Sequence, residues 1–273
     1  MVLRPDTFEG SRFTWTKPVN ESLLLDHNLS LGGETPGYSL GGIFVGPGVQ
    51  MNARVDGDAT MQGLALFHTA VGASRLEGRV DAALSDRGNH VLCRTDWIGA
   101  DWCGSATLSP NEQVQEYGLS YFQSVTQRLA LGIGLTGAVV TQDPAAGPQV
   151  MADYRVAAQY KDDNSVSTLD LHLVSTRLGM SYAHRVSSQI MLATDLEIGP
   201  GQQQAVDATA KVGWQYDLQA ALVRGTIASN GSIRCTYQQH LMPGINFDLS
   251  ATVDHQAAGG GRSPMRFGFG LSL

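Results

Sequence analysis

The chain has 273 residues, and only 16% of them are charged, against roughly 25% in an ordinary soluble protein. The formal net charge of -7 argues against nucleic acid as the main partner. No stretch of about 18 consecutive apolar residues occurs, which excludes a transmembrane helix.

The first twenty residues are the one stretch in which a helical pattern is not excluded. They lack the apolar core and the small-residue cleavage site of a secretory signal, so no such signal is expected. We therefore treat residues 1–20 as a short, partly helical N-terminal segment. Residues 21–273 form one expected domain, because no linker or shift in composition divides them.

Apolar and polar residues alternate with a period of two along much of the chain. Because successive side chains of a strand point to opposite faces, this pattern predicts strands with one apolar and one polar side. In chain order, the alternation is clear in VQMNARVD (49–56), RLEGRVDAAL (75–84), VMADYRVAAQY (150–160), STLDLHL (167–173), VDATAKVGWQY (206–216) and INFDLSATVDH (245–255).

Clusters of Gly, Pro, Asn and Asp, which tight turns favour, separate these segments. They include GGETPG (32–37), VGPG (45–48), SDRGN (85–89), QDPAAGP (142–148), KDDNS (161–165), GPGQQ (199–203), SNGS (229–232) and AAGGGR (257–262). The runs between turns give about 18 strands of roughly 9–12 residues, the length that a tilted strand needs to cross a bilayer. The sequence therefore predicts an all-β fold.

Two all-β architectures use such strands. A soluble sandwich buries its apolar faces between two sheets, whereas a membrane barrel turns them to lipid and encloses the polar faces in an aqueous lumen. The barrel is favoured because the apolar positions hold few large aromatic residues and charges occupy mid-strand positions. Aromatic residues also lie near the expected strand ends, as in the girdles of membrane barrels; they are Trp97, Trp102, Tyr160, Trp214 and Tyr216. The sandwich stays open as the alternative.

Motifs for catalysis or cofactor binding are weak. GIGLTG has the G-x-G-x-x-G spacing through Gly132, Gly134 and Gly137, but strand and turn residues follow where a nucleotide-binding motif needs a helix. Polar pairs such as Asp170 with His172 have no accompanying nucleophile. The three cysteines show no C-x-x-C spacing, and the histidines are scattered. We expect no catalytic residues, no metal and no cofactor, so the protein is not expected to be an enzyme.

The closing residues RFGFGLSL (266–273) fit the pattern polar-x-Gly-x-x-hydrophobic-x-hydrophobic. The pattern runs through Arg266, Gly268, Leu271 and Leu273, with Phe269 between them. This stretch resembles the β-signal that ends barrel proteins of the outer mitochondrial membrane, where the barrel-assembly machinery reads it.

Longer stretches resemble, in order and spacing, the pore-forming subunits of the translocase of the outer mitochondrial membrane, within the eukaryotic mitochondrial porin superfamily. They are GSRFTWTKPVNESLLLDHNLSLG (10–32), GVQMNARVD (48–56), YFQSVTQRLALG (121–132), LGMSYAHRVSSQIMLATDLE (178–197) and LVRGTIASNGSIRCTYQQHLMPGINFDLSATVDH (222–255). The likeness is greatest to plant and algal members and extends over residues 8–273.

The resemblance implies a barrel of 19 strands, with the first and last strands parallel and a helical N-terminal segment in the lumen. It also implies the mitochondrial outer membrane and its lipids as the location. The implied partners are precursor proteins with basic amphipathic targeting segments, receptor and small tail-anchored subunits, and a second copy of the chain.

Two features depart from the family pattern. The N-terminal extension before GSRF is minimal, and a very short turn between Val45 and Gln50 joins two strands where relatives carry an additional one. The count from the residues and the count implied by the family differ at that hairpin, so both 18 and 19 strands stay open.

Strand parity assigns charged residues to the lumen. The acids are Asp26, Asp56, Glu77, Asp81, Asp96, Asp153, Asp170, Asp195, Glu197, Asp207, Asp248 and Asp254, and the bases are Arg54, Arg75, Arg79, Arg94, Arg155, Arg177, Arg185, Lys211 and Arg234. Because the acids outnumber the bases, we expect the lumen to attract basic targeting segments. The acids that are candidates to line the path of these targeting segments are Glu77, Asp96, Asp153, Asp170, Asp195, Glu197, Asp207, Asp248 and Asp254.

Other interpretations remain. Any one of these acids is as well explained by pairing with an arginine on a neighbouring strand. A voltage-dependent anion channel-like metabolite porin shares the fold, but it would have a more basic lumen and an anion preference. A bacterial outer-membrane porin would need a signal peptide and typically ends in an aromatic residue, and neither feature is present.

Overall fold

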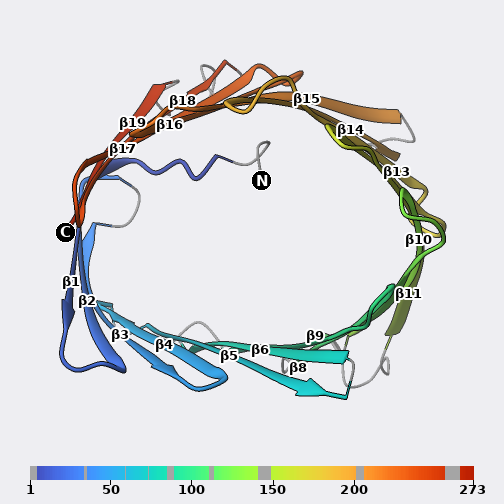
Figure 1. Ribbon diagram of the computed structural model, residues 1–273, viewed down its shortest axis with the longest axis horizontal. Helices are drawn as coiled ribbons and strands as arrows, with labels where there is room; N and C mark the ends of the chain where they lie inside the picture. Colours follow the sequence, from blue (N-terminus) through green and yellow to red (C-terminus); the bar gives the residue numbers. More distant parts are fainter. Residues whose placement is uncertain are drawn as a thin grey trace.

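The computed structural model describes residues 5–33, 36–58, 60–72, 74–84, 89–110, 114–140, 149–200, 206–255 and 265–273. Nineteen strands within these ranges form one sheet that closes into a ring (Figure 1). The strands are β1 Gly10–Pro18, β2 Leu23–Leu31, β3 Gly37–Gly46, β4 Val49–Asp56, β5 Met61–Val71, β6 Ser74–Leu84, β7 His90–Ile98, β8 Trp102–Pro110, β9 Val114–Ser124, β10 Leu129–Val140, β11 Gln149–Lys161, β12 Ser165–His172, β13 Arg177–Arg185, β14 Ile190–Pro200, β15 Val206–Asp217, β16 Ala221–Ala228, β17 Ser232–Met242, β18 Ile245–Asp254 and β19 Met265–Ser272.

Each strand pairs antiparallel with the next, and the ring closes where β1 pairs with β19 in parallel. Parallel closure follows from an odd number of strands, because the first and the last strand then run in the same direction. The structure confirms the all-β barrel, the family count of 19 and the parallel first and last strands. The soluble sandwich is wrong, because one closed sheet contains all the described strands.

The difference between 18 and 19 strands arises at the N-terminus and not at the short hairpin. Eighteen strands, β2 to β19, lie within residues 21–273, and the nineteenth is β1, within the range expected to be helical. The β3–β4 turn is complete as it stands, since Gly46 pairs with Val49 and Gly48 supplies a φ of +73°. In β1, Arg12 and Thr14 alternate with Phe13 and Trp15, so this stretch has the period of a strand.

Residues 5–9, which precede β1, run along the inside of the ring in neither a helix nor a strand (Figure 1). The expected lumenal helix is therefore absent from residues 5–20, while residues 1–4 lie outside the described part of the chain. Among the residues that the structure describes, no helix is long and apolar enough to cross a membrane.

The barrel has almost no apolar interior. Among the described residues, Ala193 is the one buried hydrophobic side chain, and large apolar side chains are exposed around the whole ring. Ile133, for example, is 65% exposed and Phe267 is 65% exposed. A soluble protein rarely exposes so much contiguous apolar surface, so this outer face requires lipid.

The expected aromatic girdle gathers at one rim. Trp97, Trp102, Trp214 and Tyr216 point outward near the strand ends that the short odd-to-even hairpins join, and Trp102 stacks on Tyr121 with centroids 6.1 Å apart. At the same rim, Tyr160 and Asp162 raise the pKa of Arg128, which lies 3.4 Å from the Asp162 carboxylate. Amphipathic rings at such a rim suit the membrane–water interface.

Candidate functional site

The register of the sheet decides which side chains face the lumen. Ser250 contacts Phe8, which lies inside the ring, so Ser250 marks the lumenal face of β18. Register partners on neighbouring strands share a face, and following them from Ser250 returns without a slip to Gly268 on β19 and Gly10 on β1. Every acid and base that parity assigned to the lumen lies on this face.

The wall carries nearly balanced charge. The lumenal acids of the strands are Asp26, Asp56, Glu77, Asp81, Asp96, Glu116, Asp153, Asp170, Asp195, Glu197, Asp207, Asp217, Asp248 and Asp254, and the bases are Arg12, Arg54, Arg75, Arg79, Arg94, Arg155, Lys161, Arg177, Arg185, Lys211, Arg224, Arg234 and Arg266. The expected acid excess therefore shrinks to one charge, and most of the net negative charge belongs to the segments outside these positions.

On β4, β6 and β7 the charges neutralise one another within each strand. Arg75 lies 2.8 Å from Glu77 and Arg94 lies 3.0 Å from Asp96, and Arg54 and Arg79 pair in the same way with the acids two residues on. Two residues along a strand return to the same face, which brings such pairs together. Glu77 and Asp96 are thus held by arginines of their own strands and not, as the alternative interpretation expected, by arginines of neighbouring strands.

A second group of charges, on β11 to β15 away from the aromatic rim, has more acids than bases; we call it the acidic sector. At the rim itself, these strands also carry Lys161, Arg185 and Asp217 on the lumenal face. The carboxylates of the acidic sector are those of Asp153, Asp170, Asp195, Glu197 and Asp207, and its cations are Arg155, Arg177 and Lys211. One ammonium serves two carboxylates here, because Lys211 Nζ lies 3.7 Å from Asp195 and 3.5 Å from Glu197.

Asp170 is another carboxylate of the acidic sector. It accepts a hydrogen bond from Arg155 Nε at 2.5 Å and lies 4.0 Å from His172 Nε2. Three carboxylates of the sector open onto a cavity of about 320 Å³ at the end of β12 to β15. Asp170, Glu197 and Asp207 line it together with Arg177 and His172. Asp207 makes no ion pair with any described residue and is exposed. This cavity is the part of the wall best suited to receive a cation from outside.

Asp153 has a different role from the other acids of the sector. Its carboxylate accepts hydrogen bonds from Val174 N at 3.0 Å, from Ser175 Oγ at 2.6 Å and from His172 Nδ1 at 2.9 Å. These donors belong to the β12–β13 turn or its edge, and Thr176 of this turn has a φ of 48°. Asp153 therefore anchors the turn rather than standing free for a ligand.

Replacing Asp153 by Ala is expected to loosen this turn without opening the barrel. Amide exchange at Val174 and Ser175 should accelerate roughly tenfold, because each opening then breaks one charge-assisted hydrogen bond fewer. Hydrogen exchange read by NMR or mass spectrometry measures the change, and Asp207→Ala is the control, expected to leave that turn unchanged. Unaltered exchange in Asp153→Ala would contradict the anchoring role.

The remaining two predicted acids lie apart from this sector. Asp248 and Asp254 are on β18, where their register partners are Gly270 and Ser232. The surrounding strands supply Arg12, Arg224, Arg234 and Arg266, so this side of the lumen is not acidic.

The residues of the predicted β-signal lie on both faces of the closing strand. Arg266 and Gly268 face the lumen, whereas the Phe269 ring packs outside against Phe13 at 6.1 Å and Phe247 at 5.3 Å. Leu271 is the register partner of Phe13 and Phe247 on that outer face. Leu273 joins the closing pair through its backbone, since its N–H donates to Thr14 and its carbonyl accepts from Thr16.

Six lumenal charges were not predicted from the sequence: Arg12, Glu116, Lys161, Asp217, Arg224 and Arg266. Arg12 lay in the range set apart as helical, and Arg224 lay in LQAALVRG, where apolar residues occupy both parities. The start of β16 at Ala221 resolves that parity, because Arg224 is then the register partner of Gln215 and Thr236.

The three cysteines provide a test of these faces without any mutation. Cys103 faces the lumen, beside Phe122, whereas Cys93 and Cys235 have outward parity. A charged, water-soluble thiol reagent should modify Cys103 in a lipid bilayer and leave the other two intact. Peptide mass mapping after labelling reads the result, and labelling of Cys93 or Cys235 in intact barrels would contradict the assignment.

Comparisons with known proteins agree with this architecture. A profile of the eukaryotic porin family matches residues 1–268. The probable mitochondrial import receptor subunit TOM40-2 of Arabidopsis thaliana is 27% identical over 292 residues, covering 100% of this chain and 86% of the relative. The mitochondrial import receptor subunit TOM40 of Saccharomyces cerevisiae is 22% identical over 271 residues, covering 91% of this chain and 69% of the relative.

Solved structures show the fold alone. A triple mutant of the Rh. blastica porin superposes with a TM-score of 0.52 at 8% identity, over 82% of this chain and 89% of that one. The match to the family profile extends over nearly the whole barrel, from β1 to the first half of β19. The chain belongs to the eukaryotic porin family.

Proposed function

We propose that the protein is a protein-conducting channel of the mitochondrial outer membrane, through which unfolded precursor proteins pass. One structural observation carries the proposal: the register places the lumenal acids and bases named above inside a closed barrel whose outer face is apolar. Relatives that match the chain over nearly its whole length support the choice of cargo, since they are named as mitochondrial import receptor subunits. Such a channel is not an enzyme.

The paired charges of the wall suit a moving polypeptide. A channel must bind its cargo well enough to admit it and weakly enough to release it. Side chains such as Arg94 and Asp96 already neutralise each other, and exposed ion pairs contribute about 0–1 kcal/mol. A passing peptide charge therefore exchanges one weak pair for another, so no single position retains it.

The acidic sector gives one side of the lumen a preference for basic segments. Figure 1 shows β11, β13 and β14 on the side of the ring opposite β1, β2 and β19. Residues 5–9 run along the wall on the side of β19, so the acidic sector stays open. We infer that basic amphipathic targeting segments bind there, attracted over a distance that salt limits to about 10 Å.

The near balance of lumenal charge keeps the metabolite porin as the second candidate. An anion-conducting pore would have a positive lumen, but the wall here has one more acid than base. We expect a modest preference for cations in planar bilayers, seen as a reversal potential of cationic sign in a KCl gradient. Clear anion selectivity would favour the metabolite porin.

The partners follow from the proposed cargo. A channel of this class would work within a translocase together with receptor and small tail-anchored subunits and a second copy of itself. Outer-membrane lipids would cover its apolar face, and the barrel-assembly machinery would read the β-signal through Gly268, Phe269 and Leu271.

A stalled precursor tests the proposal. A precursor with a basic targeting segment and a tightly folded C-terminal domain should stop with its unfolded part in the lumen. In a variant without native cysteines, Thr209→Cys, which faces the lumen, should form a disulfide with a cysteine of the precursor, whereas Ala208→Cys, its outward neighbour, should not. Equal cross-linking at both positions, or at neither, would count against protein conduction.

A further inference from the structure

The segment before the first strand is fixed to the lumenal wall. We call residues 5–9 the N-terminal strap. It leaves β1 through a sharp turn at Gly10, whose φ is +83° and where a Cβ would lie 2.4 Å from the Leu31 carbonyl oxygen. Only glycine suits this position, and the turn directs the strap into the lumen.

The strap is bound to β18 through both backbone groups of one residue, Phe8. The backbone N–H of Phe8 donates to Ser250 Oγ at 3.2 Å, and the Ser250 hydroxyl donates to the Phe8 carbonyl at 2.5 Å. Ser250 is 3% exposed. A buried hydroxyl that both accepts and donates holds the strap in one register, because losing the strap would leave it unsatisfied unless water replaces it.

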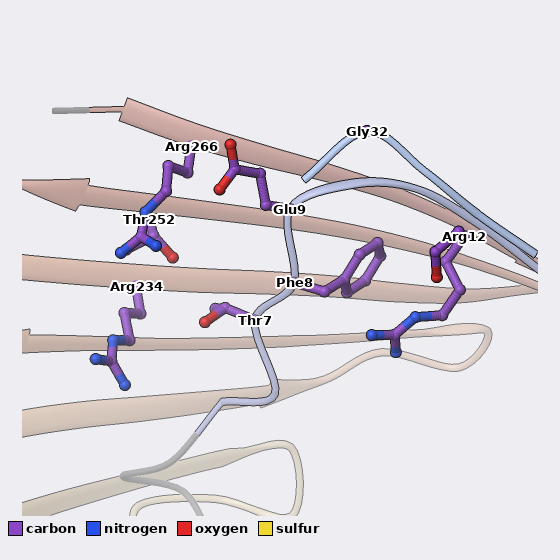
Figure 2. A pocket seen from close by; sticks show the side chains of 9 residues that line it. Thr7, Phe8, Glu9, Arg12, Gly32, Arg234, Thr252 and Arg266 are labelled. Carbon is purple, nitrogen blue, oxygen red and sulfur yellow. The ribbon is translucent and has the colours of Figure 1, made fainter. Parts of the chain in front are cut away.

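The two glycines of β19 form the seat for Phe8. A Cβ at Gly268 would lie 2.3 Å from the Phe8 carbonyl oxygen, and a Cβ at Gly270 would lie 3.1 Å from the edge of the Phe8 ring. The guanidinium carbon of Arg12 lies 4.5 Å from the centre of the same ring, a cation–π distance. Figure 2 shows Phe8 projecting along the wall toward Arg12, with Thr7 and Glu9 on either side of it in the strap.

The strap crosses the weakest junction of the barrel. The parallel β1–β19 pair has five residue pairs, fewer than any other neighbouring strands described, the next being β7–β8 with six. Parallel pairing is also slightly less stable per residue. The strap begins at the end of β1, passes over β19 and is bound to β18, so β1 cannot separate from β19 until the bonds between Phe8 and Ser250 break.

We propose that the N-terminal strap is a clamp that locks the closing seam of the barrel from the lumenal side. Phe13, Phe269 and Phe247 pack over the same seam from outside. Gly268 then has a role in the finished barrel, as the seat of the clamp, beyond any role as an assembly signal. The two roles separate when the barrel folds without assembly machinery.

The test uses the full chain refolded from denaturant into lipid vesicles, without other proteins. Ser250→Ala and a truncation that removes residues 2–9 should each raise the unfolding equilibrium constant about tenfold, as expected for one or two lost hydrogen bonds. Together they should cost no more than the truncation alone, because both remove the same contact. Thr236→Ala is the matched control: Thr236 is the lumenal register partner of Ser250, but its effect should simply add to that of the truncation.

Hydrogen exchange locates the effect. The N–H groups of Thr16 and Leu273 donate across the seam, and their exchange should accelerate about tenfold in Ser250→Ala while amides of β10 keep the wild-type rate. Gly268→Ala should behave like Ser250→Ala. Additive effects of Ser250→Ala and the truncation, unchanged exchange at Thr16 and Leu273, or wild-type stability of the truncated chain would each overturn the proposal.

Discussion

Replacing Asp195, Glu197 and Asp207 by their amides is expected to weaken block of the channel by a basic amphipathic peptide about tenfold. Each exposed lumenal charge contributes roughly 0.5 kcal/mol to a bound cation, and three together approach the 1.4 kcal/mol that corresponds to a factor of ten. The amides keep the size and shape of the side chains, but they leave the Lys211 ammonium without its two carboxylates, and its repulsion of the peptide adds to the loss.

A variant of acids outside the acidic sector is the control for this experiment. The matched variant Glu77→Gln with Asp96→Asn removes two acids that arginines already neutralise, at 2.8 Å and 3.0 Å. It leaves Arg75 and Arg94 unpaired, so it should weaken the block by repulsion only near those residues and show a different salt dependence. The half-blocking peptide concentration is measured at two ionic strengths. An acidic-sector variant blocked like the wild type would show that the sector does not bind the peptide.

Placing a charge on the outer face is expected to have the largest effect on stability. Ile133 lies near the middle of β10, is 65% exposed and points away from the lumen. A lysine near the bilayer midplane costs about 2–4 kcal/mol on a lipid-facing strand, so Ile133→Lys should shift the unfolding equilibrium in vesicles by roughly 30-fold or more.

The same substitution on the inner face should be tolerated. Ser120 on the neighbouring strand β9 pairs with Gly134 and faces the lumen, where a lysine stays in water. We expect Ser120→Lys to unfold within about twofold of the wild type and to reduce cation preference slightly. If Ser120→Lys proved as destabilising as Ile133→Lys, the assignment of faces would be wrong.

Strand parity transferred well from the sequence to the structure because it is a local property. Asp195 and Glu197 alternate with apolar neighbours, so their common face follows from two-residue periodicity alone. Closure of the ring is not local: nothing in GSRFTWTKP shows that its partner is a strand more than 250 residues away. The sequence therefore predicts only a partly helical segment over residues 1–20, although Phe13 and Trp15 alternate with polar residues as apolar residues do elsewhere.

The charge balance of the lumen was harder to predict than its faces. The lumenal position of Arg12 was not predicted because residues 1–20 were expected to be partly helical, and that of Arg224 because the alternation around it is poor. Each of these two bases lowers the acid excess of the lumen by one charge. The role of Asp153 depends on Val174 and Ser175, more than twenty residues away in the chain. The Phe8 contact likewise depends on chain closure, which brings the strap to Ser250.

Single-channel recording of the reconstituted barrel with an added peptide tests protein conduction most directly. A basic amphipathic peptide should block the cation-preferring current in brief, voltage-dependent events that shorten as the driving voltage rises, because the peptide passes through. A peptide of the same length with its basic residues replaced by glutamate should block much more weakly. An anion-selective current that neither peptide interrupts would contradict the account and identify a pore for small anions.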